Sequence, residues 1–210
     1  MIPLKEIKHL GKIKEYKKSE LVIAEGEKVD SLFIIIRGSV LFFTGDIKGS
    51  DAIAFDILST DEIFGEEALT QDNRYRINAK ALEDSSILEI PASILLNDTH
   101  LLKEIIPQII QKKRCLYDRI TNLRRESTKE QTLRTILHLA NKGYSVTHPD
   151  GLIIKASRKL LAAILLKNRE SIGRALKELE KDKVIAVNGM SILIYHQTMD
   201  DHKQSNPNVI

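Results

Sequence analysis

The sequence predicts an α+β protein with an N-terminal antiparallel β-roll, one long helix, and a C-terminal domain of short helices ending in a β-hairpin. Three observations predict this order. Short apolar runs separated by glycines fill residues 20–95, an apolar heptad follows over residues 100–126, and shorter helical patterns then precede an Asn-Gly turn. We expect a β-roll over residues 1–99, a long helix over 100–126, a helical domain over 127–196 and a flexible tail over 197–210.

The apolar runs of the first part are typical of strands. They are three to five residues long, rich in Phe, Ile and Val, and separated by turn residues such as Gly26, Gly38 and Gly45. The runs cover residues 21–23, 32–36, 40–43, 52–55 and 87–90. This pattern predicts an antiparallel sandwich or barrel.

The long helix carries a narrow apolar stripe. Its residues are spaced like the seam of a coiled coil, with Lys113 at the one heptad position that lacks an apolar residue. The seam consists of Leu102, Ile106, Ile109, Leu116, Ile120 and Leu123. Pro107 should kink the helix or mark the first turn of its main part. The stripe could pack on the β-roll, but a second copy of the helix would fill it better, which predicts a homodimer.

Three shorter helices are predicted over residues 129–142, 157–165 and 168–183. Because only Leu165-Leu166-Lys167 join the last two, they predict a helix-turn-helix. The apolar runs 184–187 and 191–195 flank Asn188-Gly189, a pair that favours a type I′ turn. This hairpin would form a wing beside the two helices.

The second helix of this pair has a face suited to reading base pairs. Asn168 is a good N-cap, and Arg169, Glu170 and Arg174 lie opposite the apolar stripe. Arginine can bind guanine through two hydrogen bonds, and glutamate can accept one from cytosine. The alternative is a solvated face with an ion pair between Glu170 and Arg174.

The charge of the chain is divided between its halves. The formal net charge is +3, but residues 1–100 carry a balance of −6 and residues 101–210 a balance of +9. Nine basic and four acidic side chains lie within residues 152–183. A polyanion such as DNA would therefore bind the C-terminal half, although an ordinary solvated surface could have the same composition.

Four segments in order resemble the Crp/Fnr family. Ser157-Arg158, Arg169 to Arg174 and Leu176 to Glu180 resemble its recognition region, and residues 147–151 resemble the turn that touches RNA polymerase. Residues 26–40 resemble its sensor jelly roll, and Phe64-Gly65-Glu66 its phosphate-binding turn. The resemblance spans residues 20 to 196.

The resemblance implies a homodimeric transcription regulator, an activator at some promoters, with a cyclic-nucleotide-binding-like β-roll and a C-terminal winged helix-turn-helix. It would bind an inverted repeat in double-stranded DNA. Carried over residue by residue, the base contacts are Arg169, Glu170 and Arg174, and the DNA-backbone contacts are Ser157, Arg158 and Asn168. The residues that would contact RNA polymerase are Thr147, His148 and Gly151.

The expected effector pocket departs from a cyclic AMP site. Its residues would lie at the turn, on the following loop and on the long helix: Gly65, Glu66, Arg74, Tyr75, Arg76, Leu116 and Tyr117. No small hydroxyl residue follows an arginine in the loop, and Leu116 and Tyr117 offer no pair of hydroxyls for adenine. We expect an unidentified anionic effector other than cyclic AMP, or no obligatory ligand.

Other site chemistries lack their residues. The single cysteine, Cys115, excludes an internal disulfide and a four-cysteine iron–sulfur cluster within one chain. No histidine lies between residues 10 and 99, so a metal site inside the β-roll lacks ligands, and haem could be reached only from His9, His100 or Cys115. We expect no metal, no haem and no enzymatic activity.

The remaining expectations concern location and partner. No apolar run is long enough to span a membrane, and the N-terminus lacks the apolar core of a signal peptide, which predicts a cytoplasmic protein. The rival hypothesis is a ligand-sensing β-roll that regulates a protein partner rather than DNA. The basic face around Arg169 and Arg174 argues against this rival.

Overall fold

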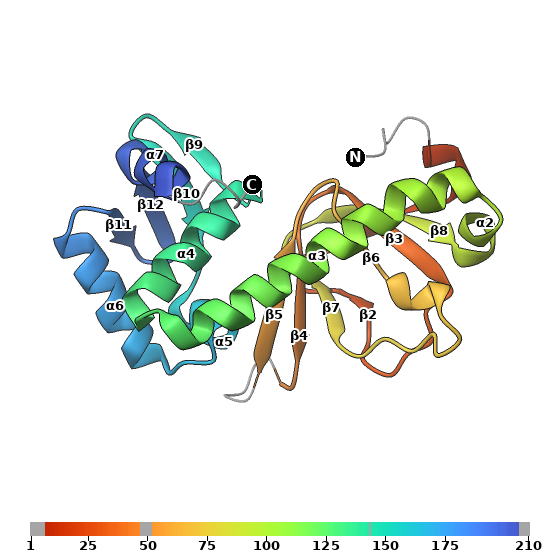
Figure 1. Cartoon of the computed structure of the whole chain (residues 1–210), viewed down its shortest axis with the longest axis horizontal. Coiled ribbons are helices and arrows are strands. Elements are labelled where there is room, and N and C mark those ends of the chain that lie inside the picture. The colour runs from red at the N-terminus through yellow and green to blue at the C-terminus, as the bar shows by residue number, and fades with distance from the viewer. Residues whose placement is uncertain (1–6, 47–51, 143, 206–210) are drawn as a thin grey trace. The chain divides into compact units, whose positions relative to one another are not determined.

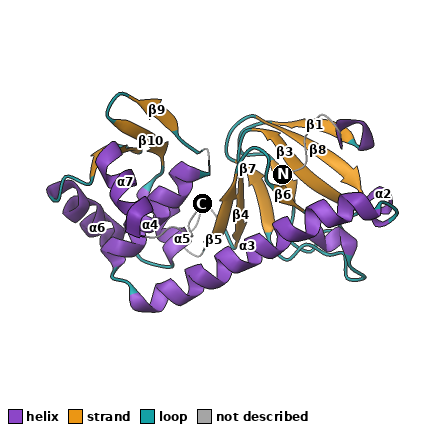
Figure 2. Cartoon of the chain, turned by 45° about the horizontal axis from the view of Figure 1, so that its top comes forward, coloured by secondary structure: helices purple, strands orange, loops and turns teal. Residues whose placement is uncertain are grey.

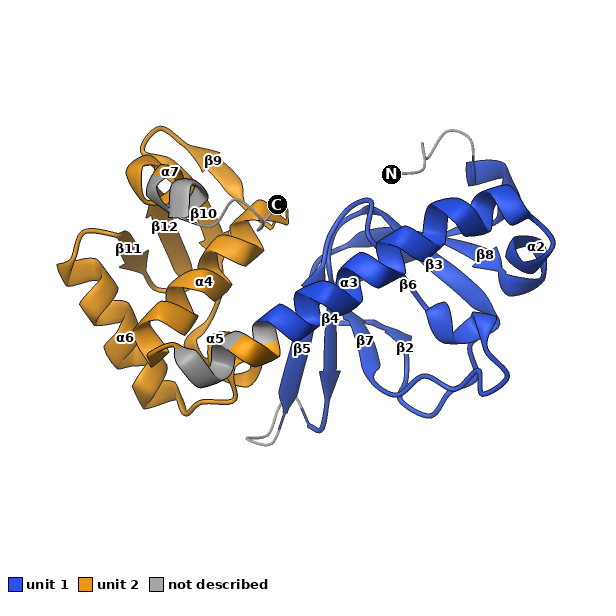
Figure 3. Ribbon diagram, in the orientation of Figure 1, with its two compact units in different colours: residues 1–119 blue, residues 120–210 orange. Residues whose placement is uncertain are grey.

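The computed structural model describes residues 7–46, 52–142 and 144–205, and the chain divides into two compact units, Met1–Arg119 and Ile120–Ile210 (Figure 3). The four-part division expected above stays a prediction, because the boundary between the units falls inside the long helix. None of the helices in the described residues is long and apolar enough to cross a membrane.

The first unit holds two four-stranded antiparallel sheets (Figure 1). One sheet has the order β1-β8-β3-β6 and the other β2-β7-β4-β5. Their strands are β1 (Lys12–Tyr16), β2 (Leu21–Ile23), β3 (Ser31–Arg37), β4 (Val40–Thr44), β5 (Ile53–Leu58), β6 (Ile63–Phe64), β7 (Asn78–Ala81) and β8 (Ser85–Pro91). The short helices are η1 (Lys8–Leu10), η2 (Glu66–Leu69) and α2 (Ala92–Leu96).

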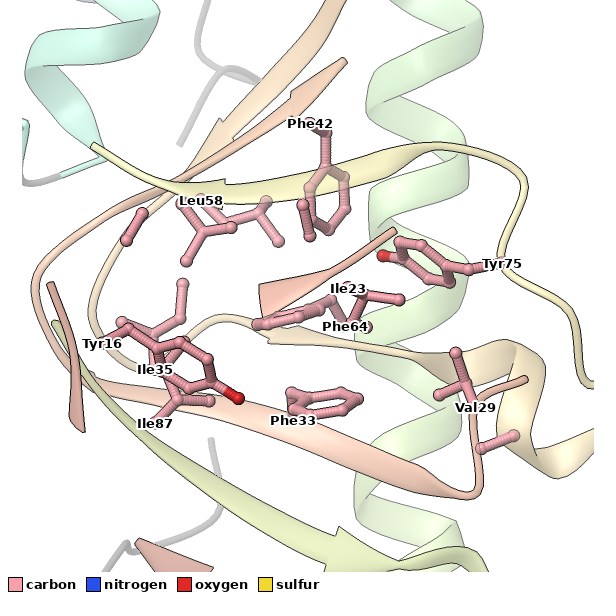
Figure 4. Close-up of a cluster of buried hydrophobic side chains, with 14 of the residues drawn as sticks. Tyr16, Ile23, Val29, Phe33, Ile35, Phe42, Leu58, Phe64, Tyr75 and Ile87 are labelled. Carbon is pink, nitrogen blue, oxygen red and sulfur yellow. The ribbon is translucent and has the colours of Figure 1, made fainter. Parts of the chain in front are cut away.

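Strand β3 is buried on both faces, as its continuous apolar run predicts. Successive side chains of a strand point to opposite faces. Phe33 and Ile35 enter one core cluster together with Phe42 and Tyr75, as Figure 4 shows. Leu32 and Ile34 enter a second cluster that Leu95, Leu101 and Ile105 complete.

The long helix α3 (Thr99–Arg125) contributes to that second cluster. Leu101 and Ile105 are buried, and Ile109 packs against the cluster from a partly buried position. Pro107 lies inside the helix rather than at its start. The face of α3 that packs on the β-roll is therefore carried mainly by residues outside the predicted seam.

The second unit places helices beside a four-stranded antiparallel sheet of order β11-β12-β10-β9 (Figure 2). Its strands are β9 (Val146–His148), β10 (Gly151–Lys155), β11 (Ile185–Asn188) and β12 (Ser191–Tyr195). Its helices are α4 (Thr128–Asn141), α5 (Arg158–Leu165), α6 (Arg169–Lys181) and α7 (His196–Ser205). Helix α4 starts at a capping box, in which the side chains of Ser127 and Glu130 each accept a hydrogen bond from the other residue's backbone N–H.

Two local features of this unit differ from expectation. The register pairs Asn188 with Ser191, so Gly189 and Met190 form the turn, and of these two only Gly189 has a positive φ, of 62°. The prediction of a type I′ turn centred on Asn188-Gly189 was therefore wrong. A positive φ at the first central residue alone is typical of a type II′ turn. The expected tail is helical up to Ser205, and Thr198 Oγ1 donates a hydrogen bond to the Val184 carbonyl at 2.9 Å.

Some strands were not predicted, for physical reasons. In β1 only Tyr16 is buried, and three of the five residues are charged, so the strand contains no apolar run. In β7 the buried residues are the small side chains Ala79 and Ala81. Neither strand has a run of consecutive large apolar residues, the pattern that predicted β2, β3, β4, β5, β8, β11 and β12. Strands β6, β9 and β10 were not predicted either.

Candidate nucleic-acid interface and effector site

Helices α5 and α6 are joined by three residues, 166–168, and each begins at a side-chain cap. The Ser157 hydroxyl accepts a hydrogen bond from the Leu160 N–H at 3.1 Å, and Asn168 Oδ1 accepts one from the Ser171 N–H at 2.7 Å. Two residues expected at the DNA backbone are thus N-caps. Each cap satisfies a backbone donor that the first turn of a helix leaves without a partner.

Helix α6 has a sharply divided surface. Its inner face is buried through Ile172, Gly173, Ala175, Leu176 and Leu179. The three predicted base contacts, Arg169, Glu170 and Arg174, are all exposed, as is Lys177. Among the described residues of this unit the ion pairs join Lys129 to Asp182 and Arg134 to Glu126, with a longer contact between His148 and Asp150. Glu170 and Arg174, both among the described residues, do not form the ion pair that the alternative interpretation of this helix face predicted.

Arg158 lies across the middle of α6. A Cβ atom built at Gly173 would be 3.6 Å from Arg158 Nη1, so the guanidinium rests against the glycine backbone. Arg158 is nevertheless exposed. The predicted backbone contact is therefore held next to the turn of α6 that carries Arg174.

The β11–β12 hairpin approaches the start of α5. The Ala156 N–H donates a hydrogen bond to the Met190 carbonyl at 2.8 Å. Ala156 directly precedes Ser157 and Arg158, so the tip of the hairpin lies beside two of the three residues expected to contact the DNA backbone. This is the place of a wing in a winged helix-turn-helix.

The predicted polymerase-contact residues lie on the β9–β10 hairpin. Thr147 is exposed and His148 is partly buried. The His148 Nδ1 accepts a hydrogen bond from the Asp150 N–H at 3.2 Å, which fixes the turn. Gly151 is buried, and a Cβ there would come within 1.8 Å of the Ile194 carbonyl oxygen, so the close approach of β12 requires glycine at this position.

In the first unit, the Gly65-Glu66 turn has a demanding geometry. Gly65 has a φ of +83°, which other residues rarely adopt. A Cβ at Gly65 would lie 2.6 Å from the Phe33 ring and 2.9 Å from the Ser31 carbonyl oxygen. Both the backbone conformation and the space therefore require glycine before η2.

Glu66 is paired with a residue that the sequence did not single out. Lys112 Nζ lies 2.8 Å from Glu66 Oε1 and 3.2 Å from the Ile63 carbonyl oxygen. It also lies 5.9 Å from the centre of the Phe42 ring. Lys112 thereby joins α3 to the β-roll at the predicted effector site. The neighbouring Lys113 occupies the heptad position that lacks an apolar residue, whereas no sequence pattern distinguishes Lys112.

The two carboxyl groups of η2, those of Glu66 and Glu67, outnumber the ammonium group of Lys112 beside them. Glu66 Oε2 and Glu67 Oε2 are buried and have no hydrogen-bond partner in the described structure. Burial raises the pKa of Glu67 above its ordinary value, and the negative charge of Glu66 adds to the shift. Burial likewise raises the pKa of Tyr75, with Glu67 and Glu66 adding to it.

The loop arginines do not join this group. Arg74 Nη1 donates a hydrogen bond to the Gly26 carbonyl oxygen at 2.8 Å, and Arg76 is paired with Asp72. Both side chains are exposed. Tyr75 points inward, its ring edge-on to Phe42 at 5.9 Å between centroids. Of the predicted pocket residues on the roll, the structure thus sets Glu66 against α3 and gives the arginines partners elsewhere.

Large apolar side chains lie exposed along α3. Ile106, Leu116 and Ile120 of the predicted seam are about half exposed, as are Ile110 and Tyr117. Leu102 is partly buried and Ile109 packs on the core, whereas the side chain of Leu123 lies outside the described residues. The exposed stripe is therefore shifted toward Ile110 and Tyr117 relative to the predicted seam.

Comparison with known proteins agrees with this architecture. Residues 13–97 match the family model described as "Cyclic nucleotide-binding domain". The chain is 29% identical over 188 residues to the cAMP-activated global transcriptional regulator CRP of Pasteurella multocida, covering 87% of this chain and 90% of that protein. It is 27% identical over 206 residues to Vfr of Pseudomonas aeruginosa, another cAMP-activated global transcriptional regulator, covering 90% of this chain and 95% of Vfr.

Solved structures show the same fold. A CRP/FNR-family transcriptional regulator from Thermus thermophilus superimposes with a TM-score of 0.79 at 22% identity, covering 95% of this chain and all of that one. The matched domain model indicates a small-molecule effector for the β-roll. The chain thus has a cyclic nucleotide-binding domain at residues 13–97, and along nearly its whole length it is similar to transcriptional regulators of the Crp/Fnr type.

Proposed function

We propose that the chain acts as a homodimer that binds an inverted repeat in duplex DNA and places α6 of each copy in the major groove. The observation that supports this most is the exposed set Arg169, Glu170 and Arg174 on a helix whose opposite face is buried. In helix-turn-helix proteins the N-terminal residues of the second helix contact base edges. All three side chains lie in the first six residues of α6.

The chemistry of these side chains defines a half-site. Arg169 and Arg174 suit guanine O6 and N7, and Glu170 suits the amino group of cytosine. Guanines and cytosines of this kind occur in the inverted repeat TGTGA–TCACA, which the resemblance to the Crp/Fnr family implies. Ser157, Arg158 and Asn168 would contact phosphates and set the register without reading bases.

The exposed stripe of α3 would form the dimer interface. A palindromic site requires a two-fold symmetric protein, and half-exposed isoleucines, a leucine and a tyrosine along one helix suit a self-complementary contact. The β9–β10 hairpin, with Thr147, His148 and Gly151, would contact RNA polymerase at promoters where the protein activates. The alternative of a protein-only partner is less favoured, because the relatives are transcriptional regulators.

The effector would bind where η2 meets α3. Although several relatives are named for activation by cAMP, this chain offers Leu116 and Tyr117 on the helix and has its loop arginines engaged elsewhere. We therefore expect a ligand other than cyclic AMP, or no obligatory one. Calorimetry with cyclic AMP tests this point: micromolar binding that Arg74→Ala abolishes would overturn it.

The test of the DNA function is equilibrium binding to a fluorescent duplex carrying the inverted repeat and to a scrambled duplex, at two salt concentrations. Preference for the repeat at both concentrations is expected, with affinity for both duplexes falling as salt rises. Equal affinity for the two duplexes would refute sequence-specific binding.

A further inference from the structure

Leu166 stands out at the turn between α5 and α6. It adopts the left-handed conformation, with φ 54° and ψ 41°, and its side chain is 61% exposed. A bulky residue rarely adopts this conformation, because its Cβ approaches the following carbonyl oxygen. A leucine at this position is both strained and in contact with water.

The turn itself does not need a leucine. The Lys167 N–H donates a hydrogen bond to the Ala162 carbonyl oxygen at 3.0 Å, which closes α5 in a Schellman motif. Glycine usually occupies the left-handed residue of this motif, since it adopts positive φ without strain. The side chain of Leu166 therefore contributes nothing to the closure of the helix.

Packing in the core does not explain the leucine at position 166 either. The residues that follow, Lys167, Asn168 and Arg169, are also exposed, so Leu166 is an apolar side chain among polar and cationic groups. Unit 2 has a second left-handed cap of this form at Lys183, with φ 58°, and there the exposed side chain is charged. The exposed apolar side chain of Leu166, next to polar and cationic residues, therefore suits a ligand that is both anionic and partly apolar.

Duplex DNA has this mixed character, since thymine methyl groups and deoxyribose carbons lie between the phosphates. We propose that Leu166 is a further DNA-contacting residue, whose side chain packs on a thymine methyl or a deoxyribose at the edge of the major groove beside Arg169. The inference rests on the DNA-binding function proposed above. It assigns the apolar contact of the half-site to the turn rather than to α6.

The test compares Leu166→Gly and Leu166→Asn with the wild-type protein. Both variants tolerate the left-handed conformation, so each should keep or raise the melting midpoint while weakening binding to the inverted repeat about tenfold. Lys183→Gly relieves the same conformation at the other end of α6 and measures what strain relief alone does to stability. Wild-type affinity in both Leu166 variants would overturn the inference.

A second duplex identifies the contacted group. Deoxyuridine in place of thymine removes the methyl groups; a weaker wild-type complex with no further loss in Leu166→Gly would assign the contact to thymine. An equal effect of the deoxyuridine duplex on both proteins, with Leu166→Gly still weaker throughout, would assign it to deoxyribose. Failure of the wild type to prefer the repeat would overturn the proposed function and, with it, this inference.

Discussion

The ammonium group of Lys112 on α3 lies 2.8 Å from the carboxylate of Glu66 in η2, and both side chains are about a quarter exposed. This ion pair couples the long helix to the β-roll through side chains. A ligand that changes the affinity of Glu66 for Lys112 would bias the position of α3, because an effector acts only by binding one state better than another. The pair is therefore a contact through which an effector bound at the proposed site would act on α3.

Lys112→Met should destabilise the first unit by about 1–2 kcal/mol, since it leaves the partly buried Glu66 without its cation. Urea unfolding measures the loss. Lys103→Met, at an exposed lysine of the same helix, should change stability by less than about 0.5 kcal/mol. Adding Glu66→Gln to Lys112→Met should restore part of the stability; strictly additive losses would show that the two groups do not interact.

Glu67 should make stability depend on pH. Its pKa is raised in the folded protein, first by burial and then by Glu66, so the folded state holds the proton more tightly than the unfolded chain does. The stabilisation is fully present below the ordinary pKa of 4.5 and is lost as pH rises through the raised value. Glu67→Gln should be more stable than the wild type at neutral pH, by a margin that narrows toward pH 4.5; parallel curves would contradict this.

The exposed stripe of α3 should hold the dimer together. Leu116→Asp with Ile120→Asp would place charges in an apolar interface without a partner, and sedimentation velocity should then show monomers. Gln111→Asp with Cys115→Asp, also at exposed positions of α3 but outside the seam, should sediment as the wild type. A dimer that survives the first pair of substitutions would place the interface elsewhere.

Asn168 combines a cap with an expected phosphate contact, and the two roles can be separated. Asn168→Asp keeps an oxygen for the Ser171 N–H, so stability should stay within about 0.5 kcal/mol, whereas Asn168→Ala should lose about 1 kcal/mol. The new negative charge should weaken binding to the repeat and to random DNA alike. Undiminished DNA binding by Asn168→Asp would remove this residue from the interface.

The sequence predicts best where one residue pattern decides one feature. The α6 face follows from helical periodicity and an N-cap, and most strands of the β-roll follow from large apolar runs. The charged strand β1 and the alanines of β7 gave no such signal.

Features that depend on tertiary contact were not predictable. Lys112 becomes significant only when the fold sets α3 against η2, and the partners of Arg74 and Arg76 depend on the course of their loop. The left-handed conformation of Leu166 could not be predicted either, because the position lacks the glycine that usually indicates it.

The most direct test of the central claim is fluorescence anisotropy of the wild type and Arg174→Ala on the inverted repeat and on random duplex DNA. If α6 reads bases, Arg174→Ala should lose about 1–3 kcal/mol of binding free energy on the repeat and much less on random DNA. Arg174 would then be a base contact of a sequence-specific regulator. Equal losses on both duplexes would contradict this and reduce α6 to a non-specific basic surface.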